Sequence, residues 1–204
     1  MGLNAKDLIA ALDALAKIEP AFAAALSRVG YPEPRINPRG YATLVRTIVG
    51  QQVSVKAAAS MYAKLDLLIG ANDPAHIAGA SDEVLREAGM SRQKAGYLRS
   101  LAELTLSGEL DLARLPADDE EAIAALTRIK GIGRWSAEIY LLFAEGRADI
   151  WPAGDLAVQI EIGRMLGHAG RPSEKLVREL AEAWRPHRGA AAILAWHHYG
   201  SATL

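Results

Sequence analysis

The chain has 204 residues, of which 50% are hydrophobic and 23% charged, and its formal net charge at pH 7 is −1. This balance predicts a globular protein with a buried core, and the absence of cysteine excludes disulfides, thiolate nucleophiles and iron–sulfur clusters. No apolar run approaches the roughly 18 residues of a membrane-spanning helix, and no signal peptide is recognisable. We therefore expect a cytoplasmic protein with no membrane partner.

Apolar residues recur at helical spacing along almost the whole chain and strand signals are nearly absent, which predicts an all-α fold. A first helix begins after Asn4 and is interrupted by Pro20. Its inward face is expected to comprise Leu8, Leu12 and Leu15. Three prolines between residues 31 and 40 forbid regular helix there and predict a linker.

Helical periodicity resumes at Tyr41 and ends at Gly50, before two adjacent glutamines, Gln51 and Gln52. Ser54 is the predicted cap of the next helix. The inward face of that helix is expected to comprise Val55, Ala58, Ala59, Tyr62 and Leu65. Further helix starts are predicted at Asp73, Ser81, Ser91 and Asp118.

The run Lys130-Gly131-Ile132-Gly133 joins two amphipathic helices through a short turn. Glycine on both sides of Ile132 permits backbone angles that side chains forbid, and Ile132 is expected to plug inward. Outward backbone N–H groups at the start of the next helix, from Arg134, would form an anion site. The alternative is a plain glycine-rich connector, but Lys130 and Arg134 favour a phosphate.

Asp155 follows a loop over residues 149–154 and is the predicted N-cap of a helix that extends to Leu166. Capping alone accounts for most aspartates in such a position. The large apolar side chains of Trp135 and Trp151 suggest in addition a pocket around this carboxylate.

Residues 126–137, together with residues 146–155, resemble the helix-hairpin-helix and Gly-Pro-Asp signature of the DNA glycosylase superfamily. The most similar branch is that of the 3-methyladenine DNA glycosylase II, or alkylbase DNA glycosylase, enzymes. The resemblance extends to residues 50–55 and to the closing region from Trp184 to Trp196. It implies a two-lobed helical bundle with an active-site cleft between the lobes: a central lobe of residues 41–146 and a second lobe of residues 1–40 plus 147–204.

The resemblance assigns Asp155 as the catalytic carboxylate, which stabilises the positive charge that develops on the sugar when the glycosidic bond breaks. A second carboxylate is not recognisable. One suffices for an alkylated purine, which is already cationic and leaves as a neutral base. Trp135 stands where relatives that also cut the DNA backbone have a lysine, and a tryptophan cannot form a Schiff base. We therefore expect a monofunctional glycosylase without lyase activity.

The target base must leave the stack, and the resemblance places Gln52, with Gln51 as the alternative, where a wedge fills the gap. A solvated polar loop is the alternative interpretation. Trp135, Trp151 and Trp196 are the candidates that stack on the flipped base, where an indole face attracts a cationic purine by about 0.5 to 2 kcal/mol. For each of them, packing in the core is the competing role.

Lys130, Gly131, Ile132, Gly133 and Arg134 are the expected contacts of the hairpin with the DNA backbone. Arg92 and Lys94 resemble a second phosphate-contacting turn, although an ordinary capped helix start with solvated charges explains them equally well.

The five histidines show no spacing typical of metal ligands, so we expect them at the surface or in the core and expect no catalytic metal. The resemblance suggests a monovalent cation, Na⁺ or K⁺, at the hairpin carbonyls and implies no organic cofactor. The expected partner is damaged duplex DNA, so the protein would associate with the nucleoid. One cleft per chain predicts a monomer.

These features predict hydrolytic excision of 3-methyladenine and related alkylated purines from duplex DNA in base excision repair. Two alternatives stay open: a noncatalytic helix-hairpin-helix module that binds DNA, and a glycosylase for deaminated or etheno-modified purines.

Overall fold

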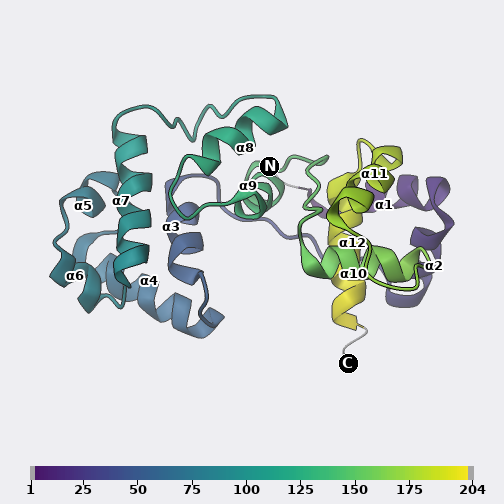
Figure 1. The fold of residues 1–204 in the computed structure, drawn as a ribbon, viewed down its shortest axis with the longest axis horizontal. Coiled ribbons are helices and arrows are strands. Elements are labelled where there is room, and N and C mark those ends of the chain that lie inside the picture. Colours follow the sequence, from purple (N-terminus) through teal and green to yellow (C-terminus); the bar gives the residue numbers. More distant parts are fainter. Residues whose placement is uncertain (1–2, 202–204) are drawn as a thin grey trace. The chain divides into compact units, whose positions relative to one another are not determined.

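The computed structural model describes residues 3–201, and every regular element in that range is helical, which confirms the all-α prediction. The chain divides into two compact units, one of residues 38–137 and one that combines residues up to Asn37 with those from Glu138 onward. The first unit contains α3 (Tyr41–Gly50), α4 (Val55–Ile69), α5 (Pro74–Gly79), α6 (Asp82–Glu87), α7 (Arg92–Leu106), α8 (Asp119–Thr127) and the start of α9 (Arg134–Tyr140). The second contains α1 (Ala5–Ile18), α2 (Pro20–Val29), a π-helical turn (Leu141–Glu145), α10 (Leu156–Met165), α11 (Glu174–Ala181), a 3₁₀ turn (Glu182–Trp184) and α12 (Arg188–Ser201) (Figure 1).

Most helices begin where a short polar side chain accepts a hydrogen bond from a backbone N–H of the first turn. Such a cap satisfies one of the amides that a helix start leaves without an intrahelical partner. The capping residues are Asn4, Ser54, Asp73, Ser81, Ser91, Asp118, Asp155 and Ser173. All the caps predicted from the sequence are confirmed, because capping depends on local chemistry.

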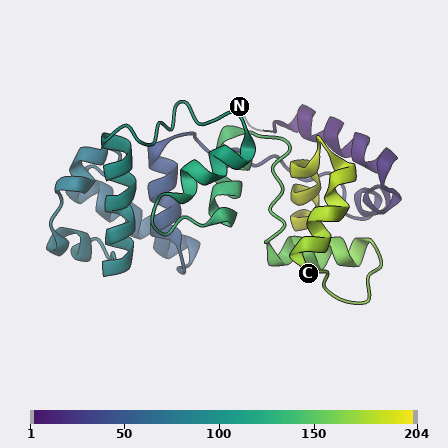
Figure 2. The ribbon, with the colours of Figure 1, turned by 45° about the horizontal axis from the view of Figure 1, so that its top comes forward.

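Helix α7 is central to the unit of residues 38–137, where it packs against α3 and α5 (Figures 1 and 2). Its Leu98 and Leu101 are fully buried, as are Leu44 and Ile48 of α3. Ile123 and Leu126 of α8, and Ile129 in the turn after it, are also buried. This core holds α3 beside α7.

Helix α4 departs from the prediction. Of its five expected inward residues only Leu65 is buried, and Val55 is 89% exposed. The main packing partner of α4 is α3, and contact with one helix buries only a narrow strip. The apolar residues of α4 therefore follow helical periodicity without forming a core.

In the other unit α12 packs against α10, α2 and α1 (Figure 1). Leu8, Leu12 and Leu15 of α1 are fully buried as predicted. Trp184 contacts the rings of Phe22 and Trp151 edge-on, with centroid distances of 4.9 and 5.5 Å. These aromatic rings form the core beneath the loop that leads to Asp155.

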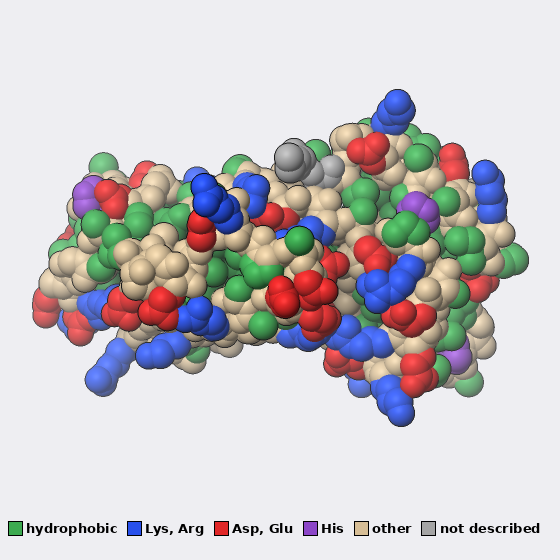
Figure 3. Space-filling model, turned by 90° about the horizontal axis from the view of Figure 1, so that it is seen from above, with side chains coloured by type: hydrophobic (Ala, Val, Ile, Leu, Met, Phe, Trp, Pro, Cys, Tyr) green, Lys and Arg blue, Asp and Glu red, His purple; other side chains and the backbone are tan. Residues whose placement is uncertain are grey.

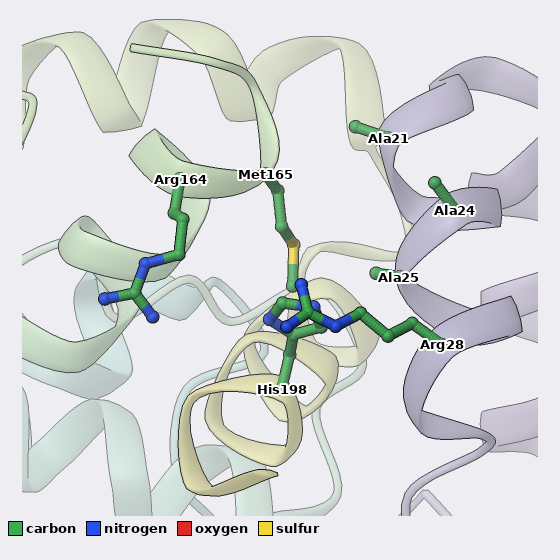
Figure 4. Close-up of a pocket in the computed structure, with 7 residues that line it drawn as sticks. All are labelled: Ala21, Ala24, Ala25, Arg28, Arg164, Met165 and His198. Atoms are coloured by element: carbon green, nitrogen blue, oxygen red, sulfur yellow. The ribbon is translucent and has the colours of Figure 1, made fainter. Parts of the chain in front are cut away.

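A buried polar cluster joins α10 to α12. The carboxylate of Glu161 is fully buried, contacts His198 Nδ1 at 2.5 Å and accepts a hydrogen bond from Arg164 at 2.9 Å. His198 borders a cavity of about 190 Å³ whose opposite wall is the alanine-rich face of α2, with Arg28 beside it (Figure 4). His198 is thus a core histidine, as expected.

Acidic and basic side chains alternate over the face of the molecule that Figure 3 shows, in keeping with the formal charge of −1. No helix within residues 3–201 is long and apolar enough to cross a membrane.

Candidate active site

The hairpin between α8 and α9 is anchored by two buried isoleucines. Ile129 is fully buried and Ile132 is 3% exposed, and the Ile132 N–H donates to the Ile129 carbonyl at 3.0 Å. The prediction that Ile132 plugs inward is confirmed. The residues between and after them, Lys130, Gly131 and Gly133, are exposed.

The two hairpin glycines have different roles. Gly131 has a φ of +82°, and a Cβ there would lie 2.2 Å from the Tyr97 ring. Gly133 does not have a positive φ, and a Cβ there would meet no atom within 4 Å. The expectation that both glycines are needed for unusual backbone angles is therefore wrong for Gly133. Nothing within the described part of the chain requires a glycine at that position.

The two cationic residues of the hairpin, Lys130 and Arg134, also differ in their surroundings. Lys130 is exposed, and its backbone N–H donates to Ser100 Oγ at 3.1 Å. The Arg134 guanidinium pairs with both carboxylate oxygens of Glu120, one of them at 2.7 Å. Sequence analysis missed this ion pair because Glu120 lies at the start of α8, away from the hairpin in the sequence.

The turn after α3 lies against the hairpin. Gln51 Nε2 donates a hydrogen bond to the Gly131 carbonyl at 2.8 Å. Gln52 is exposed and has a φ of +57°, the only non-glycine residue within 3–201 in the left-handed region. The structure thus separates the two wedge candidates: Gln51 bonds inside the protein, whereas Gln52 occupies the exposed turn.

The start of α7 holds the two remaining backbone-contact candidates. Arg92 is exposed. Lys94 Nζ instead donates to the Val49 carbonyl in the last turn of α3, at 2.7 Å, and burial lowers the pKa of this ammonium group. The expected phosphate contact of Lys94 is therefore at odds with the structure, in which its charge is directed at a helix C-terminus. A sequence spacing cannot reveal this partner, which lies 45 residues away.

Asp155 is the N-cap of α10, as predicted. Its Oδ1 accepts two hydrogen bonds, one from the Val158 N–H at 2.9 Å and one from Trp196 Nε1 at 3.1 Å. The side chain is only partly buried. Two donors on one oxygen hold the carboxylate in a defined orientation.

The three candidate tryptophans of the base pocket occupy three kinds of environment. Trp135 is 49% exposed near the start of α9. Trp196 is bonded to Asp155 and partly exposed. Trp151 is 3% exposed, donates its Nε1–H to the Val177 carbonyl at 3.2 Å and contacts Trp184. Trp151 is therefore a core residue, and its assignment to the base pocket is wrong because both its ring and its N–H are used in packing.

A cavity of about 430 Å³ adjoins Trp196 in the same unit. Phe143, from the π-helical turn, lies in its wall with its ring centroid 5.7 Å from that of Trp196. Arg35 of the linker also lines it, and its guanidinium carbon lies 5.8 Å from the Phe143 centroid. Neither residue was a candidate from the sequence, since Phe143 lies in an ordinary apolar run and Arg35 in a loop.

No group of three or more metal-ligating side chains occurs within residues 3–201. Backbone carbonyls of the hairpin are the remaining oxygen ligands, and three of them already accept hydrogen bonds, including Gly133 O from Ala137 N at 3.0 Å. Ile129 O accepts from Ile132 N at 3.0 Å, and Gly131 O accepts from Gln51 Nε2 at 2.8 Å. A carbonyl oxygen has two lone pairs, so such ligands still fit a monovalent cation.

Comparison with known proteins identifies the family of the chain. Residues 45–186 match the family described as HhH-GPD superfamily base excision DNA repair protein. The chain is 33% identical to DNA-3-methyladenine glycosylase 1 of Schizosaccharomyces pombe, over 76% of this chain and 71% of the relative. It is 30% identical to DNA-3-methyladenine glycosylase 2 of Escherichia coli, over 86% of this chain and 65% of the relative.

Solved structures give the same result. A 3-methyladenine DNA glycosylase of Schizosaccharomyces pombe in complex with abasic DNA matches 95% of this chain and 97% of its own, with a TM-score of 0.78 and 29% identity. A DNA-3-methyladenine glycosidase from Bacillus halodurans matches 91% of each chain, with a TM-score of 0.75 and 31% identity. The fold similarity and the family match agree, and the chain belongs to the HhH-GPD superfamily of base excision DNA repair proteins.

Proposed function

We propose that the protein is a monofunctional DNA glycosylase that flips 3-methyladenine and related alkylated purines out of duplex DNA and hydrolyses their N-glycosidic bonds. The observation that carries this proposal is the Asp155 carboxylate, which the N–H groups of Val158 and Trp196 orient. The Trp196 ring in turn lies beside the ring of Phe143. Relatives that share 30% or more of the sequence are named DNA-3-methyladenine glycosylases.

The chemistry requires little from the protein beyond this carboxylate. When the bond between the sugar C1′ and the purine breaks, its electron pair neutralises the cationic base, which leaves without an added proton. The sugar becomes oxocarbenium-like, and Asp155 stabilises its positive charge. The oxygen of a water molecule then bonds to C1′ and releases one proton, so the products are a free base and an abasic site.

The residues expected at the DNA are consistent with this reaction. The exposed Gln52 is the candidate that enters the duplex, and Lys130 and Arg92 are the exposed cations for phosphates. Trp135 is an exposed indole at the place where lyase relatives have lysine, and it supplies no amine. Gly133 leaves room for close approach of a phosphate to the hairpin backbone.

The proposal also includes Na⁺ or K⁺ at the hairpin carbonyls, with no organic cofactor. Such an ion would add positive charge where the DNA backbone approaches. DNA affinity should then be higher in a potassium salt than in tetramethylammonium at equal ionic strength. Equal affinities in the two salts would remove the ion from the proposal.

The decisive test incubates methylated duplex DNA with the wild type and with Asp155→Asn, and measures released bases and DNA affinity separately. We expect release by the wild type alone and similar binding by both. Binding without release from any damaged duplex would assign a noncatalytic module instead. Release of etheno or deaminated purines but not of alkylated ones would change the substrate class, and strand cleavage without alkali would contradict the absence of lyase activity.

We expect the protein to act as a monomer at the nucleoid, because one site per chain needs no second copy and the substrate is chromosomal DNA. Size-exclusion chromatography with light scattering, in the presence and absence of DNA, tests the first of these expectations.

A further inference from the structure

One face of α7 contacts both turns that are proposed to meet DNA. Lys94, Tyr97 and Ser100 are spaced three residues apart and so lie on one side of the helix. Lys94 Nζ reaches the Val49 carbonyl, and Ser100 Oγ accepts the Lys130 N–H. The Tyr97 ring occupies the space where a Cβ of Gly131 would lie, 2.2 Å away.

A direct bridge completes the arrangement. Gln51 Nε2 donates to the Gly131 carbonyl at 2.8 Å, which joins the turn after α3 to the hairpin. Val49, the acceptor for Lys94, lies only two residues before Gln51. The exposed Gln52 is therefore preceded by two anchored residues, one held by α7 and one held by the hairpin.

The hydrogen bonds of Lys94 and Gln51 each have a physical reason. The last carbonyls of a helix have no intrahelical partner, and an ammonium group at a helix C-terminus satisfies one of them and opposes the helix dipole. The left-handed backbone at Gln52 costs about 1 to 2 kcal/mol for a residue with a Cβ. A strained conformation of this kind persists only when the surrounding structure constrains it.

We propose that Gln51 and Lys94 are positioning residues that set the distance between the inserted Gln52 side chain and the phosphate held by the hairpin. This inference rests on the proposed base-flipping function. The hairpin fixes where the backbone of the DNA lies, and the bridged turn fixes where the wedge enters. Gln51 acts through its amide donor, and Lys94 acts through its ammonium group without contacting DNA.

The test separates positioning from phosphate binding. The duplex contains a 2-aminopurine beside a tetrahydrofuran abasic analogue, so that its fluorescence reports local unstacking at saturating protein. Lys94→Met and Gln51→Met, which removes the amide donor to the Gly131 carbonyl without adding charge, should lower the amplitude at least threefold. Their affinity for undamaged duplex and its salt dependence should equal those of the wild type. On methylated duplex we expect the single-turnover rate at saturation to fall about tenfold, since small misplacements of reacting groups have large effects.

Arg92→Met is the matched contrast, because Arg92 is an exposed cation two residues before Lys94 on the same helix. It should weaken binding and lower the salt slope by about 0.9, the value for one lost phosphate contact. Lys94→Arg, which retains a cationic donor, should restore most of the fluorescence amplitude. Thermal melting of each variant verifies the fold.

Several outcomes overturn the inference. If Lys94→Met behaves like Arg92→Met, Lys94 is a phosphate contact. If the Lys94 and Gln51 variants both give the full fluorescence amplitude, the hydrogen bonds of these residues do not position the wedge. The absence of any fluorescence change with the wild type also rejects the inference. If the wild type unstacks the probe but releases no base, the proposed glycosylase function is contradicted and the positioning inference stands.

Discussion

Trp196 donates its indole N–H to the same oxygen of Asp155 that accepts the Val158 N–H, at distances of 3.1 and 2.9 Å. One donor belongs to α10 and the other to α12, which pack against each other. The orientation of the carboxylate therefore depends on tertiary packing as well as on the local cap. Trp196 thus has a role that stacking on a base does not describe.

Trp196→Phe should slow base release while DNA binding changes little. The ring is largely retained, but the carboxylate loses a charge-assisted hydrogen bond, whose contribution of about 1.5 to 3 kcal/mol corresponds to roughly a tenfold to hundredfold lower rate. Single-turnover excision from methylated duplex at saturating protein measures it. An unchanged rate would show that the Trp196 N–H does not help to orient the carboxylate.

Trp151→Phe is the matched control, because it removes the same kind of N–H from the core. Its loss leaves the Val177 carbonyl without this donor, so the free energy of unfolding should fall by about 1 to 3 kcal/mol. The excision rate per folded molecule should stay at the wild-type value. A rate loss without a stability loss would return Trp151 to the base pocket.

Alanine at the two hairpin glycines should separate folding from binding. Gly131→Ala should destabilise the fold by about 2 to 5 kcal/mol, because it forces a side chain into left-handed backbone and onto the Tyr97 ring. Gly133→Ala should cost less than about 1 kcal/mol. It should nevertheless weaken DNA binding about tenfold, equivalent to 1.4 kcal/mol, by blocking the approaching backbone. Denaturant unfolding and fluorescence anisotropy measure the two effects, and full affinity of Gly133→Ala would place the DNA elsewhere.

Removing the charge of Lys130 and removing that of Arg134 should change the salt dependence of DNA binding by different amounts. Lys130→Met should reduce the slope of log affinity against log salt by about 0.9, uniformly for damaged and undamaged duplexes. Arg134→Met should reduce it less, because Glu120 already compensates the guanidinium charge. Glu120→Gln should strengthen binding at low salt. Equal slopes for the two cation variants would show that DNA displaces the carboxylate.

Glu161→Ala should destabilise the protein by about 3 to 5 kcal/mol, because Arg164 and the buried His198 lose their shared carboxylate. Glu179→Ala, which breaks an exposed pair with Lys175, should cost less than about 1 kcal/mol. Denaturant titrations compare the two. A small effect at Glu161 would mean that water replaces the carboxylate in the cluster.

Local signals predicted the helices, their caps and the position of Asp155, because a cap needs only its own side chain and the amide of a residue two or three positions on. The all-α class followed from apolar periodicity for a similar reason. Periodicity alone could not show that the main packing partner of α4 is a single helix, so most of its expected inward face is not fully buried.

The errors concern side chains whose partners are distant in sequence. Lys94 donates to the Val49 carbonyl, and Trp151 donates to the Val177 carbonyl. In each case the residue type matched a DNA-contacting role, but packing brought another acceptor within reach. Conversely, Phe143 lines the cavity beside Trp196, although no sequence motif distinguished it.

Gln52 imposes a limit on how stable this protein can become. Glycine would relieve the left-handed strain at that position at no cost to packing, since the side chain is exposed. Retaining glutamine there keeps the side chain that is proposed to fill the gap in DNA. Selection for thermal tolerance and selection for repair therefore oppose each other at a single codon, so a heat-adapted homologue should compensate elsewhere in the unit before it replaces this residue.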